Sequence, residues 1–207
     1  MFARRSKRKL VFDLNNHIDG THINIWDYTH IRAYHACRPL SIQEYLDKGI
    51  IPYTKSAAMK DAMNRLGTKR QEEQIKEKFN EMWGDAEASK PRVWLALNKE
   101  TLLTCSGHYL IYGSEFLNAL AMQTGCREHL KDIGMPTIFY CNIPIEDISK
   151  DWLSDVERTI NEWECDDISV YVSQVKAENI IDLEHPEQIA NPYEFGHYYR
   201  PNYEKLK

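Results

Sequence analysis

The sequence has few of the features that mark secreted or membrane proteins. It has only five cysteines in 207 residues, widely spaced and with no Cys-x-x-Cys pair. This pattern is typical of reduced thiols in a cytoplasm-like compartment rather than of disulfides or a zinc site. No apolar run approaches the ~18 residues of a membrane-spanning helix, and the apolar stretch after "RRSKRK" (residues 4–9) is too short for a secretory signal. We therefore expect a cytoplasmic protein that does not associate with membranes.

Positive charge and the common nucleotide-binding motifs are also scarce. The formal net charge is −5, which argues against a general nucleic-acid coat protein but allows a local basic patch. "RRSKRK" is either a solvated tail or an arm that contacts phosphate. No G-x-G-x-x-G, P-loop, H-E-x-x-H or G-x-S-x-G motif occurs, and the histidines do not pair at metal-ligand spacing. We expect no metal cofactor.

The composition, 43% hydrophobic and 28% charged, is that of a globular protein of one domain, residues 1–207. Alternating segments such as "HIRAYHAC" (30–37) and "DISVYVSQV" (167–175) predict strands. Residues 54–90 instead carry helical spacing with many charges, which predicts a helical insertion. The expected fold class is α+β, with a twisted or split, antiparallel-rich sheet and peripheral helices.

One segment, "AYHACRPLSIQEYLDKGI" (33–50), combines several of these signals. Alternation places Ile31, Ala33 and His35 on one face of a strand. A short helix should follow, with Ser41 as its N-cap and Gly49 as its C-terminal stop. His35 and Arg38 then lie where the strand ends, either as ligand-binding residues or as a satisfied histidine and a surface ion pair.

A second cluster, "SGHYLIYGSE" (106–115), predicts another strand ("LLTCSGHYLIY", 102–112) that ends at a helix capped by Ser114. Its Tyr109 and Tyr112 are either ring-binding walls or ordinary sheet aromatics. If the two clusters meet, they form a cleft lined by a histidine, an arginine and aromatic faces. Such a lining suits a flat cationic ring that carries an amide and a phosphate.

These two clusters resemble the first two motifs of the poly-ADP-ribose polymerase-like branch of the ADP-ribosyltransferase superfamily. In that branch a strand ends in His-Gly-Ser/Thr and runs on through "xxILxxGL"; here Ala36 stands at the glycine. The resemblance implies that His35 hydrogen-bonds the adenosine ribose of NAD, that the backbone of Ala36 holds the nicotinamide carboxamide, and that Arg38 meets the pyrophosphate. It also implies that Tyr109 stacks on nicotinamide, with Ser114 donating to its carboxamide and Tyr112 as a second ring wall.

The third motif of this family is an acidic residue at the start of a late strand. The match is Asp166, with Glu164, Asp167 and Glu194 as alternatives. The resemblance implies catalysis by His35, Tyr109 and Asp166, in which the acid stabilises positive charge at the anomeric carbon.

The expected function is therefore NAD-dependent ADP-ribosyl transfer to a protein or nucleic acid. It would suit a toxin or defence effector, which could have a cognate inhibitor protein. Two alternatives remain open. One is a catalytically degenerate fold that binds a nucleotide or a protein, and the other is a relative that removes RNA 2′-phosphates.

Overall fold

A six-stranded sheet organises the computed structural model, which describes residues 9–17, 21–67, 71–85, 89–162 and 167–206. Five strands follow one another as antiparallel neighbours. In spatial order they are β5 (Ser169–Val172), β3 (Val93–Ala96), β2 (His30–Cys37), β4 (Thr137–Pro144) and β6 (Ile180–Glu184). β1 (Val11–Phe12) pairs in parallel with the first residues of β2. Together with its helices, this sheet confirms the predicted α+β class.

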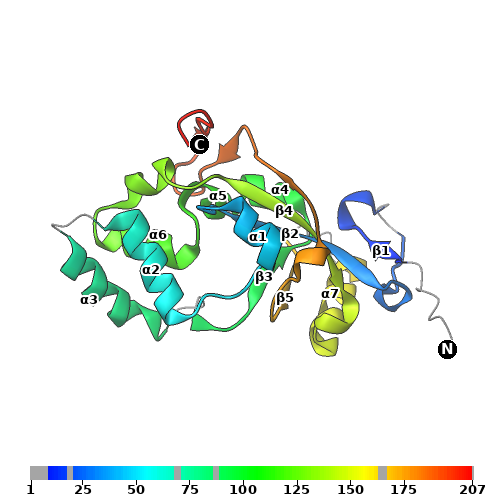
Figure 1. The fold of residues 1–207 in the computed structure, drawn as a ribbon. Helices are drawn as coiled ribbons and strands as arrows, with labels where there is room; N and C mark the ends of the chain where they lie inside the picture. The colour runs from blue at the N-terminus through cyan, green and yellow to red at the C-terminus, as the bar shows by residue number, and fades with distance from the viewer. Residues whose placement is uncertain (1–8, 18–20, 68–70, 86–88, 163–166, 207) are drawn as a thin grey trace.

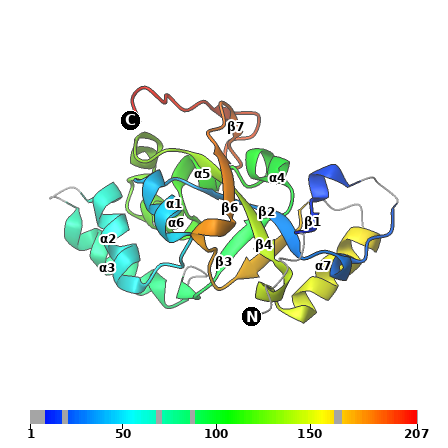
Figure 2. The same cartoon turned by 45° about the vertical axis from the view of Figure 1, so that its right-hand side comes forward.

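The helices lie at both ends of the sheet (Figures 1 and 2). At one end are α2 (Lys55–Leu66), α3 (Glu72–Trp83) and α6 (Glu115–Gln123), and at the other is α7 (Lys150–Glu162). α1 (Ile42–Lys48), α4 (Lys99–Thr104) and α5 (His108–Tyr112) are shorter. The described 3-10 helices are η1 (Leu14–Asn16), η2 (Ile25–Asp27), η4 (Arg127–Asp132), η5 (Ile145–Asp147) and η6 (Ala177–Asn179). A small hairpin near the C-terminus joins β7 (Ile189–Ala190) to β8 (Tyr198–Tyr199).

The central strand β2 separates two hydrophobic cores. Ile31 and Ala33 belong to one core, and Tyr34 and Ala36 belong to the other. Because successive side chains of a strand point to opposite faces, this division follows from the alternation in the sequence and confirms it. The core around Tyr34 is completed by α2, α3, α5 and α6, and the other core by α7, β5 and residues of β1, β3 and β4.

The pairing between β2 and β3 stops beside the C-terminal half of β2. On one edge β2 pairs with β4 along all of its length. On the other edge β1 pairs with His30 and Ile31, and β3 pairs only at Tyr34 opposite Ala96. Beyond Tyr34 no further β2–β3 pair is described, and this gap is where a cavity forms.

Two strands predicted from the sequence are helical instead. Residues 102–112, expected to be a strand, form the end of α4 and all of α5. The apolar run Leu110–Tyr112 fits a buried strand or one face of a buried helix equally well, and Asn98 favours the helix by capping α4 through the backbone N–H of Glu100. The alternation in "HINIWDY" (22–28) also predicts a strand, but its Ile25–Asp27 form the turn η2, which Asn24 caps by accepting from the backbone N–H of Trp26.

The helical prediction for residues 54–90 is confirmed. Helices α2 and α3 form within residues 54–90, and Phe79 of α3 packs edge-on against Phe116 of α6 at 5.1 Å.

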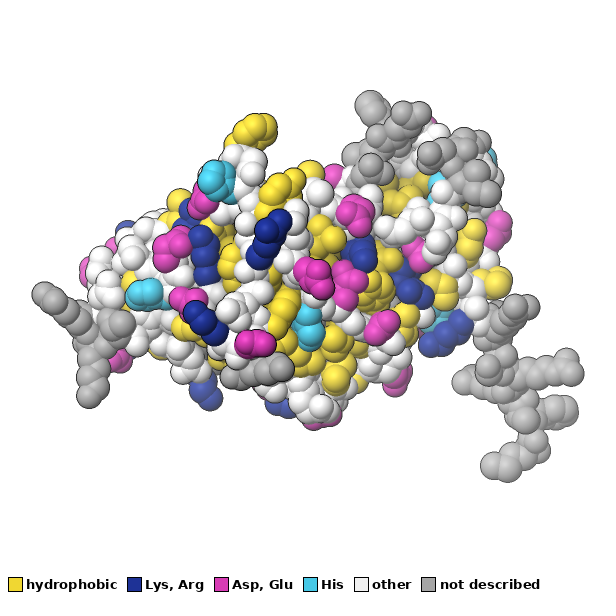
Figure 3. Space-filling model, turned by 90° about the horizontal axis from the view of Figure 1, so that it is seen from above, with side chains coloured by type: hydrophobic (Ala, Val, Ile, Leu, Met, Phe, Trp, Pro, Cys, Tyr) yellow, Lys and Arg dark blue, Asp and Glu magenta, His cyan; other side chains and the backbone are white. Residues whose placement is uncertain are grey.

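Among the described residues no helix has both the length and the apolar character needed to cross a membrane. Acidic and basic side chains are interspersed over the face shown in Figure 3.

Candidate functional site

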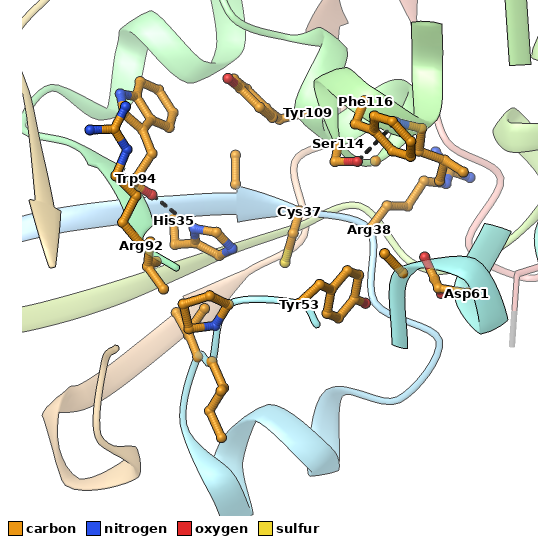
Figure 4. Close-up of a pocket in the computed structure, with 18 of the residues that line it drawn as sticks. His35, Cys37, Arg38, Tyr53, Asp61, Arg92, Trp94, Tyr109, Ser114 and Phe116 are labelled. Atoms are coloured by element: carbon orange, nitrogen blue, oxygen red, sulfur yellow. Dashed lines mark hydrogen bonds between the residues drawn. The ribbon is translucent and has the colours of Figure 1, made fainter. Parts of the chain in front are cut away.

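The candidate site is a cavity of about 200 Å³ at the gap between β2 and β3. Residues from both halves of the predicted cleft line it, namely His35, Ala36, Arg38, Tyr109 and Ser114. Side chains at 35 and 36 leave a strand on opposite faces, so they can share one cavity only because the cavity reaches around the open edge of β2. Figure 4 shows this arrangement, with Tyr109 on one side of the strand and His35 on the other.

His35 is held in one orientation by the neighbouring strand. Its Nδ1 lies 3.0 Å from the backbone carbonyl oxygen of Trp94. Because a carbonyl oxygen can only accept, Nδ1 carries the proton, and in the neutral ring Nε2 is an acceptor. Burial lowers the pKa of His35, and the bond to Trp94 opposes this shift only in part. Figure 4 shows the second ring nitrogen facing the cavity, where it can accept a hydrogen bond from a ligand hydroxyl.

Tyr109 lies on helix α5, not on the expected strand, and its ring is already packed. It stacks on Trp94 with ring centroids 5.1 Å apart and an angle of 25° between the planes. The ring of His108 lies 4.1 Å away, tilted by 36°. A ligand ring can therefore stack on Tyr109 only if it displaces one of these rings, and otherwise it meets the edge of Tyr109.

Ser114 connects the cavity to helix α6. Its Oγ caps the helix by accepting from the backbone N–H of Leu117 at 3.1 Å, which leaves the hydroxyl hydrogen able to donate to a ligand. The preceding Gly113 has φ of +94°, a conformation that side chains with a Cβ rarely adopt. This turn lets α5 end and α6 begin beside the cavity.

Arg38 contributes to the cavity wall, but its charged group is used inside the protein. The residue is 2% exposed. All five N–H groups of a guanidinium find acceptors here, which are the backbone carbonyls of Ile133, Leu110, Ile111 and Lys131 and the hydroxyl of Tyr199. No donor remains for the pyrophosphate that the family resemblance assigns to this residue, and Arg38 instead ties β2 to α5 and η4.

Tyr112 lies outside the lining of the cavity. It is fully buried, its hydroxyl accepts from the side-chain amide of Asn191, and the guanidinium of Arg127 lies 4.2 Å from its ring centre. These contacts fill its surroundings with protein groups, so the structure does not place Tyr112 as a second ring wall.

The expected catalytic acid is not brought into the cavity by any described residue. Asp166 and Glu164 lie outside the described residues, while Asp167 and Glu194 are exposed and do not line it. The one described carboxylate in the lining is Asp61, which accepts from Nε of Arg65 with both oxygens at 2.9 Å. Asp61 is thus held by a buried arginine.

One cysteine thiol, that of Cys37, lies in the lining of the cavity. Cys37 lines it beside His35, but burial raises the pKa of its thiol to about 12. The reactive form of cysteine is the thiolate, so Cys37 contributes to packing.

Several lining residues were not identified from the sequence. Trp94 comes from β3 and Arg92 from the position just before it, and Tyr45 and Tyr53 come from α1 and the segment after it. The sequence did indicate that Trp94 lies on a strand, because "RVWLALN" has a strand pattern, and such a strand could pair with β2. What brought its backbone carbonyl within reach of His35 was the pairing of β2 with β3, and the two residues are 59 positions apart in the chain.

Comparisons with protein-family models, curated proteins and solved structures found no match to this chain. Within the described ranges no group of three or more His, Cys, Asp or Glu side chains is arranged to hold a metal ion.

Proposed function

We propose that this cavity binds the nicotinamide end of NAD and that the chain is an ADP-ribosyltransferase. One observation carries the proposal: residues of two motif-like segments about 70 residues apart, His35–Ala36 and Tyr109–Ser114, line a single cavity. The family resemblance requires these two segments to lie around one cavity, and the gap between β2 and β3 provides that cavity.

The size and polarity of the cavity are consistent with one ring rather than a whole dinucleotide. Ligand pockets for drug-sized molecules occupy roughly 300–1,000 Å³, whereas this one holds about 200 Å³. Aromatic rings from Trp94, Tyr109 and Phe116 supply apolar walls, and Ser114 supplies a donor for a carboxamide. The rest of NAD would extend out of the cavity, whose lining also includes Lys90 and Arg92, and cationic side chains favour a pyrophosphate.

In the reaction, the bond between the nicotinamide nitrogen and the ribose anomeric carbon breaks. Nicotinamide leaves as a neutral base with the bonding electron pair, and an acceptor nucleophile forms the new bond and gives up its proton. His35 would hold a ribose hydroxyl through Nε2, with its ring fixed by the Trp94 carbonyl. Such preorganised contacts are typically worth about 10²–10³ in rate.

The test is NAD binding and cleavage by the whole chain. We expect a thermal shift with NAD and with 3-aminobenzamide, and release of nicotinamide from NAD. His35→Ala and Tyr109→Ala should each abolish NAD turnover while remaining folded, whereas Tyr198→Ala, at an exposed tyrosine on β8, should not. Turnover at the normal rate in both site variants would contradict the proposal.

A second candidate is a catalytically inactive relative that binds a nucleotide or a protein. The specific observations that favour it are the pairing of Asp61 with Arg65 and the coverage of the Tyr109 ring by Trp94. A thermal shift with NAD without any release of nicotinamide would support this candidate over the enzyme.

A further inference from the structure

Four buried polar atoms gather around the side chain of Tyr193, on the loop between β7 and β8. Within the described ranges, the buried side-chain nitrogen and oxygen atoms that lack a hydrogen-bond partner are Nε2 of His108, Oδ1 of Asn118, and Nε and Nη2 of Arg127. The hydroxyl of Tyr193 accepts from Nδ2 of Asn118 at 3.0 Å. Its ring centre lies 4.4 Å from the guanidinium of Arg127 and 6.1 Å from the ring of His108. Buried polar groups are normally paired, and unpaired atoms in one place mark a site that a ligand could complete.

Arg127 offers one whole edge of its guanidinium. The ring centres of Tyr112 and Tyr193 lie 4.2 and 4.4 Å from it, so the flat faces of the group make cation–π contacts. Nε and Nη2 are the two nitrogens of a single edge, and neither has a hydrogen-bond partner. Such an edge can donate two parallel hydrogen bonds to two oxygens of one anion. The ligand that completes this site is therefore an oxyanion.

Tyr193 is the residue that separates the guanidinium from solvent. Tyr112 is fully buried, whereas Tyr193 is 46% exposed. The base of the loop is held by Asn191, whose backbone N–H donates to the carbonyl oxygen of His197 and whose side-chain amide donates to the hydroxyl of Tyr112. Beyond this base the loop extends into solvent, and Phe195 is fully exposed. The side chain of Tyr193 can therefore turn outward without opening the core, and a phenol ring that leaves provides more room than a small oxyanion needs.

Asn118 distinguishes among oxyanions. It is 2% exposed, its Oδ1 is an acceptor without a donor, and its Nδ2 is released when Tyr193 turns outward. The ligand must therefore accept from Arg127 and Asn118 and also donate to Oδ1 of Asn118. A carboxylate or a sulfate has only acceptors at neutral pH, and a phosphate monoester loses its last proton near about pH 6. Inorganic phosphate keeps at least one O–H group at neutral pH.

We propose that Arg127, Asn118 and His108 form a binding site for inorganic phosphate, and that Tyr193 covers it. Two oxygens of the ion accept from Nε and Nη2 of Arg127, one accepts from Nδ2 of Asn118, and the O–H group donates to Oδ1 of Asn118. Nε2 of His108 completes the set of contacts. This site does not depend on NAD, although it adjoins the candidate cavity, because the ring of His108 lies 4.1 Å from that of Tyr109.

The test is isothermal titration of the whole chain with inorganic phosphate, sulfate, acetate and methyl phosphate at about pH 7.5 and constant ionic strength. Inorganic phosphate should bind at least about tenfold more tightly than the other three ions, because each of these leaves Oδ1 of Asn118 without a donor.

Variants locate the ion. Arg127→Gln removes the fork and should weaken phosphate binding at least about tenfold, and Arg127→Lys, which keeps the charge but not the fork, should weaken it nearly as much. The matched control Arg158→Gln, at an exposed arginine on α7, should leave it unchanged. Tyr193→Ala should bind phosphate several-fold more tightly because no ring has to move, whereas Tyr198→Ala, at an exposed tyrosine on β8, should bind like wild type.

Several results would overturn the proposal. Equal affinities for phosphate and sulfate, or tighter binding of methyl phosphate, would contradict the choice of ion. Phosphate binding that is the same in wild type and in both Arg127 variants would place the ion elsewhere, and Arg127→Lys alone decides if Arg127→Gln does not fold. Absence of phosphate binding by wild type would exclude the site, and weaker binding by Tyr193→Ala would exclude Tyr193 as its cover. None of these measurements uses NAD, so they are decided separately from the function proposed above.

Discussion

Replacing Arg38 by methionine should destabilise the protein severely without acting through a ligand. Its guanidinium is 2% exposed and gives all of its N–H groups to protein acceptors. Methionine fills similar space but leaves these backbone carbonyls, two of them on α5, without partners. Breaking a buried charged network of this kind costs about 3–5 kcal/mol.

That cost predicts measurable shifts. For a chain of 150–250 residues, 1 kcal/mol corresponds to roughly 2–4 °C in Tm, so Tm should fall by about 6–20 °C. With a urea slope of about 2 kcal/mol per M, the unfolding midpoint should fall by about 1.5–2.5 M. Arg158→Met is the matched control, because that arginine is 61% exposed and pairs with the exposed Asp155. It should cost less than about 0.5 kcal/mol.

The assay is urea unfolding followed by circular dichroism, with NAD thermal shifts on each folded variant. An unchanged midpoint and slope for Arg38→Met would refute the reasoning. Loss of NAD binding by a variant as stable as wild type would show that Arg38 contacts the ligand, as the family resemblance implies.

Three further predictions follow from single contacts. Gly49→Ala should lower the free energy of unfolding, measured in urea, by more than about 2 kcal/mol. The reason is that Gly49 has φ of +82° and a Cβ there would lie 2.1 Å from the carbonyl oxygen of Val175. Gly84→Ala is the control and should be neutral or slightly stabilising, because Gly84 has φ of −59° and open space around it. Burial lowers the pKa of His35 below its ordinary value of 6.5. As the pH falls through about 6.5, the unfolded chain therefore takes up a proton that the folded chain does not, and the folded state loses stability. The urea midpoint should fall between pH 7.5 and pH 5.5, and it should fall less in His35→Gln. Ser114→Asp should keep the helix cap and the stability but weaken 3-aminobenzamide binding, because a carboxylate cannot donate to the carboxamide, whereas Ser114→Ala should also lose about 1 kcal/mol.

Each of these has a clear contrary outcome. Equal midpoints for Gly49→Ala and Gly84→Ala would show that the backbone near Val175 moves freely. A pH dependence identical in wild type and His35→Gln would assign it to other groups, among them His30 and His108, whose pKa values burial also lowers. Unchanged 3-aminobenzamide binding by Ser114→Asp would remove Ser114 from the carboxamide contact.

Features that depend on a few neighbouring residues could be predicted from the sequence. The alternation in 30–37 assigns side chains to two cores because a strand has a period of two. Ser41 and Ser114 cap helices because a hydroxyl reaches the backbone N–H three residues on. The helices within 54–90 follow from their spacing of apolar residues.

Where local signals were equivocal, packing decided. The apolar run Leu110–Tyr112 satisfies a buried strand as well as a buried helix, and it became α5 because α4 is capped before it and its apolar side chains pack against β2 and α6. The sequence likewise could not tell whether Arg38 meets a phosphate or backbone carbonyls, because its acceptors lie 72 to 161 residues away in the chain.

The sequence by itself determined that His35 would stand near the end of a strand, and that Ser114 would cap the helix that follows Tyr109. Only the tertiary structure decided that these residues share a cavity and that Trp94 covers the ring of Tyr109. It also decided that Arg38 donates all of its side-chain hydrogen bonds to protein groups. The physical reason is range: alternation and capping act over two to four residues, whereas strand register and buried hydrogen-bond partners are set by the packing of segments far apart in the chain.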